Sequence, residues 1–160
     1  MSGRSTRIIV AVVLAVVLGV AWFVVDQRDD VPAPLVNSGN VELVALGRNV
    51  YTESCASCHG AFLKGEADWQ VRKSDGRLPA PPHDETGHTW HHDEQTLFVL
   101  TKYGPSKLIG GAYESDMPAF DGILTDEEIW AVLAFIKSTW PTEIQERWEQ
   151  INMRAQQQSR

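Results

Sequence analysis

Cys55-Ala56-Ser57-Cys58-His59 contains both cysteines of the 160-residue chain, and this pentapeptide predicts more about the protein than any other stretch. Two thiols three residues apart, followed at once by an imidazole, form the C-x-x-C-H pattern of a haem attachment site. On one turn of helix, Cys55 and Cys58 lie on the same side, where each sulfur can add to one vinyl group of a haem. The neutral imidazole of His59 is a standard axial ligand of haem iron. The pentapeptide therefore predicts one haem c, bound covalently through Cys55 and Cys58, with His59 as an iron ligand.

Three other kinds of site use two cysteines at this spacing: a thioredoxin-like redox pair, half of a zinc site and a structural disulfide. A structural zinc site needs further thiolates, and the chain has no third cysteine. A redox pair sits at the start of a helix in a βαβ unit, whereas no alternating strand pattern surrounds Cys55 and Cys58. We therefore favour haem attachment.

The amino-terminal residues have the composition of a membrane anchor. Residues 8–25 are 18 consecutive residues without a charge, and as a helix they cover roughly 27 Å, enough for a bilayer core. Arg4 and Arg7 precede this run and Asp26 follows it, so the positive-inside rule leaves the amino terminus in the cytoplasm. We expect residues 1–25 to form a cytoplasmic tip and a single-pass anchor in the cell membrane, with the haem domain on the periplasmic (extracytoplasmic) side.

A cleaved signal peptide is the alternative for the same residues. Gly19-Val20-Ala21 offers a small-x-small cleavage site, but the apolar residues 22–25 rather than a polar segment would follow the cut. Beyond the anchor, residues 26–39 show no hydrophobic periodicity and contain Pro32 and Pro34. We expect this segment to be an extended linker.

The acidic residues are unevenly distributed along the chain. All 21 Asp and Glu lie from residue 26 onward, together with 12 of the 14 Lys and Arg, so this part carries a net charge of −9. A domain with this charge is not expected to bind nucleic acid, whose phosphates would repel it. Its partner proteins should present a basic or locally neutral surface.

The haem motif is preceded by a predicted helix that begins at Asn40 or Ser38 and continues into Cys55. The apolar face of this helix consists of four residues, Val41, Val44, Ala45 and Tyr51. Gly47 lies on the same face, where the missing side chain allows another helix to approach closely.

Three further helices are predicted, which makes the expected fold all-α. Residues 93–103 form a short helix, and residues 104–124 are irregular. Thr125-Asp126-Glu127-Glu128 is a capping box, and the helix that it opens has a wide apolar surface and ends at Trp140-Pro141. Residues 141–160 form an additional tail helix, which packs either on the domain or on a partner.

Two residues complete the predicted iron site. A methionine thioether is the soft ligand of a His/Met site, and Met117 is favoured because Met1 precedes the anchor and Met153 lies in the polar tail. Filling a gap in the core is the alternative role for Met117. In a stiff proline-rich segment, the carbonyl group of Pro81 can accept a hydrogen bond from the other ring nitrogen of His59 and fix its orientation.

Two polar clusters have less specific interpretations. The first contains four histidines: His83, His88, His91 and His92. A copper or zinc site is conceivable there, but we expect a polar turn instead of a second metal, because adjacent histidines do not point the same way on a helix. The second is a basic-aromatic patch, which either pairs with haem propionates or forms a solvated surface: Lys64, Trp69, Arg72, Lys73 and Arg77.

With these motifs the chain resembles a class I c-type cytochrome, specifically a membrane-anchored monohaem one. The likeness covers about residues 40–140 and is carried by Gly47, Tyr51, the C-x-x-C-H motif, Met117-Pro118 and Ala134-Phe135-Ile136-Lys137. The resemblance implies a cytochrome c-like fold in which Gly47 and Tyr51 contact Phe135 where the first and last helices of the domain cross. It also implies His59 and Met117 as axial ligands and electron transfer as the activity.

The expected function is therefore one-electron transfer, not an enzymatic reaction, between membrane-associated redox partners such as an oxidase or a quinol-oxidising complex. Two alternatives remain open. In a haem-based sensor, the sixth position of the iron opens for a small ligand, and Met117 is dispensable. In a copper-handling protein, the histidines of residues 83–92 collect copper.

Overall fold

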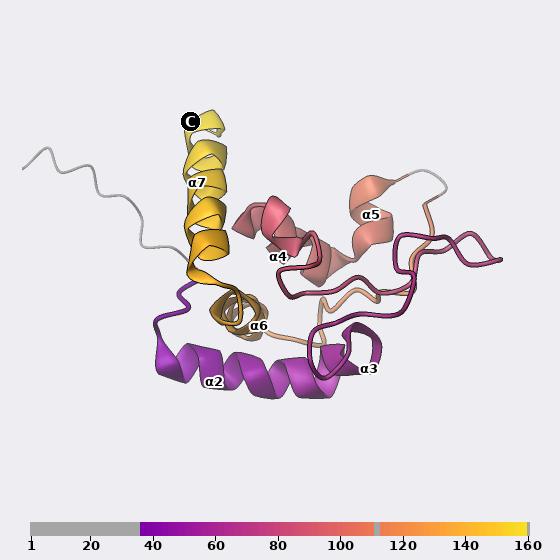
Figure 1. Cartoon of the computed structure of the whole chain (residues 1–160), viewed down its shortest axis with the longest axis horizontal. Coiled ribbons are helices and arrows are strands. Elements are labelled where there is room, and N and C mark those ends of the chain that lie inside the picture. The colour runs from indigo at the N-terminus through magenta and orange to yellow at the C-terminus, as the bar shows by residue number, and fades with distance from the viewer. Residues whose placement is uncertain (1–35, 111–112, 160) are drawn as a thin grey trace, which may run out of the picture. The chain divides into compact units, whose positions relative to one another are not determined.

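The computed structural model describes residues 36–110 and 113–159, most of which lie in helices or the loops between them (Figure 1). The helices are α2 (Val41–Val50), α3 (Ala56–His59), α4 (Glu94–Tyr103), α5 (Pro105–Ile109), α6 (Asp126–Ser138) and α7 (Thr142–Gln158). A π-helical turn, Tyr51–Cys55, joins α2 to α3, and a 3-10 turn, Thr89–His91, precedes α4. The described residues contain no strand, and their one isolated bridge pairs Asp121 with Leu124. The expectation of a mostly helical chain is confirmed for them.

The predicted anchor, residues 1–25, lies outside the described residues. Among the helices that the structure describes, none is long and apolar enough to cross a membrane.

The end of the predicted linker, residues 26–39, is packed instead of extended. Val36 is buried, its N–H donates to Glu94 Oε2 at 3.3 Å and its carbonyl accepts from Lys137 Nζ at 3.5 Å. That part of the prediction is wrong because an apolar residue fills space beside α4 and α6.

α2 begins at one of the two caps that the sequence predicts, Asn40, whose Oδ1 accepts from the N–H of Leu43 at 3.0 Å. The predicted apolar face is only partly correct. Val41 is 75 % exposed and Ala45 is also exposed, whereas Gly47, Val50 and Tyr51 are buried. These buried residues lie where α6 packs on α2: the carbonyl of Ala131 lies against Gly47, and the ring of Phe135 lies against that of Tyr51.

The crossing of α2 and α6 depends on Gly47. Figure 1 shows α6 nearly end-on above α2, so the two helices cross steeply. A Cβ atom on Gly47 would lie 1.9 Å from the carbonyl oxygen of Ala131, a distance at which no side chain fits. The ring of Tyr51 packs against that of Phe135, with 5.4 Å between their centroids. The contacts implied by the family resemblance are therefore present.

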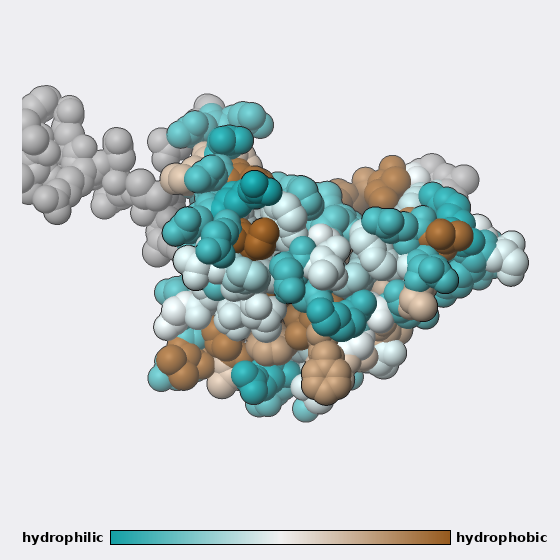
Figure 2. All heavy atoms as spheres, viewed as in Figure 1, coloured by the Kyte–Doolittle hydropathy of each residue, from teal (hydrophilic) through white to brown (hydrophobic). Residues whose placement is uncertain are grey.

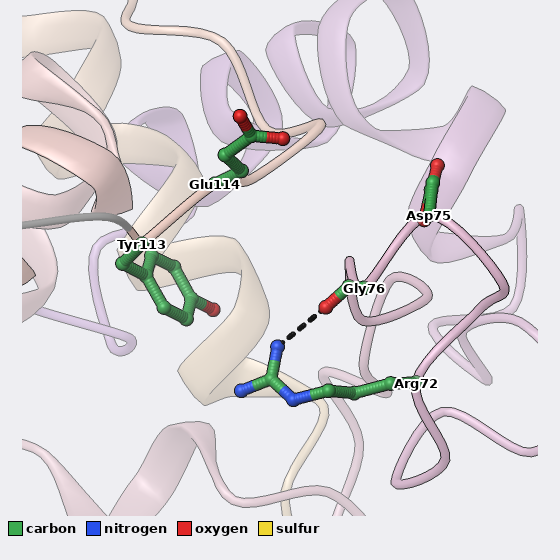
Figure 3. A pocket seen from close by; sticks show the side chains of 5 residues that line it. All are labelled: Arg72, Asp75, Gly76, Tyr113 and Glu114. Carbon is green, nitrogen blue, oxygen red and sulfur yellow. Dashed lines mark hydrogen bonds between the residues drawn. The ribbon is translucent and has the colours of Figure 1, made fainter.

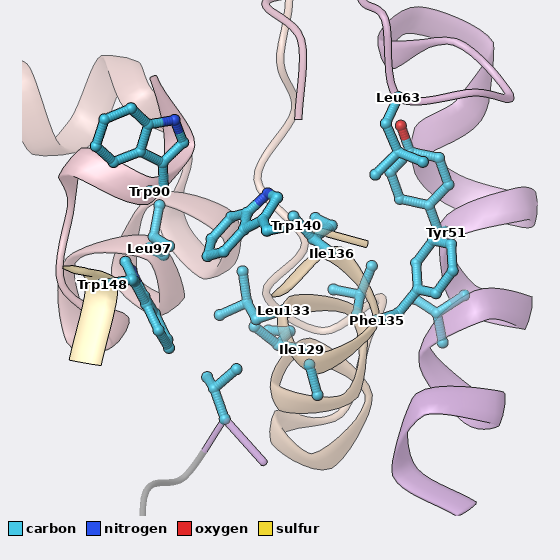
Figure 4. Close-up of a cluster of buried hydrophobic side chains, with 14 residues drawn as sticks. Tyr51, Leu63, Trp90, Leu97, Ile129, Leu133, Phe135, Ile136, Trp140 and Trp148 are labelled. Carbon is cyan, nitrogen blue, oxygen red and sulfur yellow. The ribbon is translucent and has the colours of Figure 1, made fainter. Parts of the chain in front are cut away.

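α6 is the central helix of the core. It begins with the predicted capping box, in which Thr125 Oγ1 accepts from the N–H of Glu128 and the Glu128 carboxylate accepts from the N–H of Thr125. Ile129 and all residues from Ala131 to Lys137 are buried. Figure 4 shows side chains from the neighbouring segments gathered around this helix.

α4 and α5 occupy the middle of the chain. Asp93 caps α4 by accepting hydrogen bonds at its first turn, and Phe98 of α4 stacks on Trp130 of α6 at a centroid distance of 4.3 Å. The prediction of irregular structure for residues 104–124 is wrong at its start, where α5 forms. Pro105 occupies the first turn of α5, where the missing N–H has no helical partner to lose.

The tail helix, α7, packs on the domain. Trp148 is 1 % exposed, its ring meets the ring of Trp140 edge-on at 5.7 Å, and its Nε1–H donates to the carbonyl of His92 at 2.6 Å. One turn later, Asn152 Oδ1 accepts from the N–H of Glu94 at 2.7 Å. Of the two positions that the sequence leaves open for this helix, the structure shows the first.

Candidate functional site

Both cysteines lie where α2 continues into α3. Cys55 ends the π-helical turn and is partly buried, and Cys58 is exposed within α3. Both thiols are free. Burial, together with the charge of nearby Cys58, raises the pKa of Cys55 to about 11, so Cys55 is a neutral thiol at neutral pH. The π-helical turn has no sequence signal that we recognise, although such turns are frequent at functional sites.

The imidazole of His59 is buried and has one ring nitrogen engaged. Its Nδ1 lies 2.8 Å from the carbonyl oxygen of Pro81. Because a carbonyl only accepts, Nδ1 carries the proton and Nε2 keeps its lone pair. Burial lowers the pKa of His59, against the opposing effect of the Pro81 hydrogen bond. The ring is therefore neutral near pH 7 and offers Nε2 as a ligand atom.

The contact between His59 and Pro81 is the one that the sequence predicts, and two residues support it. Gly65, at a φ of +66°, lets the two segments approach, since a Cβ there would lie 2.6 Å from the carbonyl carbon of Pro81. The hydroxyl of Tyr51 donates to the carbonyl of Gly60 at 3.0 Å, and this hydrogen bond fixes the position of the end of α3. Neither supporting role follows from the sequence alone.

His83 lies beside His59, although the sequence analysis considered it only as part of a four-histidine cluster. Its ring centroid lies 4.0 Å from that of His59, with 30° between the ring planes. Burial, followed by the charges of His59 and His88, lowers the pKa of His83 well below its ordinary value, so the ring is neutral. The sequence grouped His83 with candidate ligands of a second metal. Its position two residues after Pro81, in a stiff segment, is the signal that places it beside His59.

The other three histidines of residues 83–92 lie against aromatic rings. His88 stacks on Trp69 at a centroid distance of 5.3 Å and meets the ring of His92 edge-on at 5.6 Å. His91 stacks on Trp90 at 3.7 Å. Across residues 36–110 and 113–159, the structure brings no three His, Cys, Asp or Glu side chains together as a metal site. A copper-handling role gains no support from this geometry.

Met117 lies in a segment that ion pairs connect to another loop. Met117 itself is half-buried. Its neighbour Asp116 pairs with Lys73 at 3.0 Å and with Arg77 at 2.6 Å, and Arg77 also pairs with Glu114 at 3.2 Å. The loop that carries Met117 is thus held at one end, while the role of Met117 as the second iron ligand stays a prediction.

The basic-aromatic patch is engaged within the protein, although Lys64, Arg72 and Lys73 are exposed to solvent. Each of its five residues has a partner within the protein: Lys64 with Asp84, Trp69 with His88, Arg72 with Gly76, Lys73 with Asp116, and Arg77 with Glu114 and Asp116. Arg72 differs from the other cations because its partner here is a backbone carbonyl, at 2.6 Å.

A shallow hollow of about 330 Å³ lies beside Arg72. Figure 3 shows Tyr113 and Glu114 facing Arg72, Asp75 and Gly76 across it. Its lining combines one cation with two carboxylates and includes neither a predicted iron ligand nor a predicted haem-attachment cysteine. We assign no role to it.

The residues around His59 fit a covalently attached haem. Two free thiols on one helical turn supply the sulfurs, and one of them, Cys58, is open to solvent. The adjacent imidazole is buried, neutral and held in the tautomer that leaves Nε2 available. This donor set is the one that haem attachment requires.

Comparisons with known proteins also favour haem attachment. A family model described as Cytochrome c matches residues 44–140, which is more than half of the chain. A search of curated proteins and a search of solved structures each returned no match.

Proposed function

Because this chain belongs to the cytochrome c family, whose domains bind haem c covalently and typically transfer electrons, we propose that it is a monohaem one-electron carrier. Cys55 and Cys58 hold the haem through thioethers, and His59 and Met117 are the axial ligands. The haem supplies the reversible change between ferric and ferrous iron. The protein supplies ligand choice, burial and orientation, which set the reduction potential.

The observation that carries this proposal is the hydrogen bond from His59 Nδ1 to the Pro81 carbonyl, 2.8 Å long, beside two free thiols. An imidazole held in this way presents one defined nitrogen to the iron, as an axial ligand must. Neither of the neighbouring cysteines forms a disulfide in the structure.

The proposed setting is the outer face of a cell membrane. Residues 8–25 would anchor the chain, and the acidic part that follows would work on the periplasmic side with an oxidase or a quinol-oxidising complex. Tethering raises the effective concentration of the domain at such a partner. The face seen in Figure 2 is largely hydrophilic with scattered apolar residues, which suits a transient, charge-guided contact.

Haem attachment is tested by expressing the full chain in a host that matures c-type cytochromes and extracting it with acid acetone. The haem should stay with the polypeptide, and Cys55→Ser together with Cys58→Ser should abolish this retention. A colourless polypeptide, or haem that is extracted from the wild type, would overturn the proposal.

Axial ligation is tested separately by Met117→Ala with Met153→Ala as the matched control, since Met153 is 49 % exposed on α7. We expect Met117→Ala to lose the weak far-red band of methionine-ligated ferric haem and to lower the reduction potential, and Met153→Ala to change neither. If Met117→Ala keeps the wild-type spectrum, the iron has another sixth ligand or an open position, and a sensor role replaces His/Met electron transfer.

The anchor is tested by fractionating cells and sequencing the amino terminus of the mature protein. A membrane-bound chain that begins at Met1 or Ser2 supports an anchor. A mature terminus at Trp22 shows that the segment is a cleaved signal peptide.

A further inference from the structure

The imidazoles of His83 and His59 pack against each other in a tilted arrangement, and the proposed function makes no use of this contact. Their centroids are 4.0 Å apart and their planes differ by 30°. Contact at this distance limits how far either ring can turn, because a turned edge would collide with the neighbouring ring. The contact therefore bears on the orientation of the predicted iron ligand.

His83 is itself rigidly held. Its N–H donates to the carbonyl of Leu63 at 2.8 Å, and its own carbonyl accepts from Nε1–H of Trp140 at 2.8 Å. Its Nδ1 lies 2.9 Å from Thr89 Oγ1. Backbone and ring are thus fixed independently.

Thr89 determines which nitrogen of His83 carries the proton. Thr89 is buried, and its hydroxyl donates to the carbonyl of Pro82 at 3.5 Å. The hydroxyl oxygen is then left as an acceptor, so Nδ1–H of His83 is the donor. The ring of Tyr51 closes another side of His83, edge-on at 6.1 Å. His83 is therefore a flat, neutral surface with no freedom to swing away from His59.

The hydrogen bond of His59 leaves one motion unrestricted. The contact between Nδ1 and the Pro81 carbonyl fixes the tautomer and one point of the ring, but the ring can still rock about the N–H···O direction. The face of His83 blocks that rocking. Among the described residues, His83 is the one aromatic ring found against His59.

We propose that His83 is a positioning residue that holds the plane of the axial imidazole of His59 in one orientation by packing its ring against it. This inference rests on the proposed function, because it needs His59 to be an iron ligand. Groups behind an axial histidine are among the means by which a protein tunes a metal centre. His83 would thus contribute to a single, homogeneous ferric state.

The test compares variants of the full-length holoprotein by electron paramagnetic resonance of the ferric form, which reports axial-ligand orientation. His83→Leu fills a similar volume without a flat ring, and we expect its g-values to shift or broaden. His83→Phe restores a flat face, and its g-values should stay close to those of the wild type. Thr89→Val keeps the His83 ring but removes its acceptor, and a smaller broadening is expected. His91→Ala is the control, because His91 is exposed and stacks on Trp90.

The outcomes separate this inference from the proposed function. If the wild type holds thioether-bound haem but His83→Leu has unchanged g-values, His83 does not position the ligand and the proposed function stands. The same conclusion follows if His83→Phe is as perturbed as His83→Leu, since a flat ring is then not what matters. If the wild type holds no covalent haem, the proposed function and this inference fall together, and the wild-type spectrum alone reveals that case.

Discussion

Asp84, directly after His83, shows how a single buried carboxylate secures the segment beside the site. Its side chain is 8 % exposed and pairs with Lys64 Nζ at 2.6 Å. Thr86 donates to its Oδ1 from the hydroxyl at 2.5 Å and from the N–H at 2.9 Å. Burial alone would raise the pKa of Asp84, but the hydrogen bonds from Lys64 and Thr86 outweigh it and lower the pKa below its ordinary value.

This shift predicts an acid dependence of stability. A carboxyl whose pKa is lower in the folded state stabilises the fold above its ordinary pKa of about 3.9, and the contribution is lost as the pH falls through the lower folded value. Asp84→Asn should therefore reduce the free energy of unfolding at neutral pH and flatten its decline in acid. Urea unfolding between about pH 7 and pH 3 measures both effects. Glu85→Gln, at the exposed neighbouring carboxylate, is the control, and equal pH profiles for Asp84→Asn and the wild type would contradict the prediction.

Among the elements, α2 and α6 depend on a glycine for their close approach. The carbonyl of Ala131 occupies the space that a side chain on Gly47 would need. The same crossing brings Tyr51 against Phe135 and so connects the core to the end of α3. Substitutions at the crossing of α2 and α6 are therefore expected to alter the position of His59.

Gly47→Ala should destabilise the protein although alanine favours helix by about 1 kcal/mol. The added methyl group forces α2 and α6 apart, and overpacking of this kind costs about 1–3 kcal/mol. We expect a lower unfolding midpoint and a smaller fraction of chains with attached haem. Gly39→Ala is the control, since the nearest atom to its Cβ is an Asn37 side-chain oxygen at 3.3 Å. Equal midpoints for the two variants would show that the helices do not meet at Gly47.

α7 should contribute to the stability of the domain through Trp148. Removing a buried tryptophan typically costs about 3–5 kcal/mol, and the carbonyl of His92 would also lose its partner. Trp148→Ala is therefore expected to lower the unfolding midpoint strongly, and Met153→Ala on the exposed side of the same helix only slightly. Thermal unfolding followed by circular dichroism compares them. If the two variants unfold together, α7 does not pack on the domain in solution.

At the scale of the whole molecule, charges connect loops that are far apart in sequence. Lys73 and Arg77 pair with Asp116 and Glu114, beside the predicted ligand Met117. Exposed ion pairs are individually weak and are screened by salt, but several that share partners act together. The loop of Met117 is therefore expected to be the part of the site that is most sensitive to ionic strength.

Arg77→Glu should weaken methionine ligation by placing three negative charges together. The far-red band should be lost at a lower temperature than in the wild type, and high salt should narrow the difference because it screens the repulsion. The swap Arg77→Glu with Asp116→Arg restores an opposite pair and should recover part of the loss. An unchanged band in Arg77→Glu would show that these ion pairs do not hold the loop of Met117.

Several features of this protein follow from local chemistry and residue spacing in the sequence. The C-x-x-C-H pentapeptide, the capping box at Thr125 and the cap at Asn40 depend on neighbouring residues, so they can be recognised without the fold. The close approach at Gly47 follows similarly from the lack of a side chain. The stiff proline-rich segment predicts a carbonyl group, that of Pro81, that can accept a hydrogen bond from His59, and this contact is present.

Only the tertiary structure decided which surfaces meet. Hydrophobic periodicity marks a helix face but not where a neighbour crosses it, and so Val41 and Ala45 proved exposed while Val36 in the expected linker proved buried. The contact of His83 with His59, the packing of α7 and the ion pairs of Asp116 join residues separated by long stretches of chain. Such contacts depend on the path of the backbone through space, which no local pattern specifies.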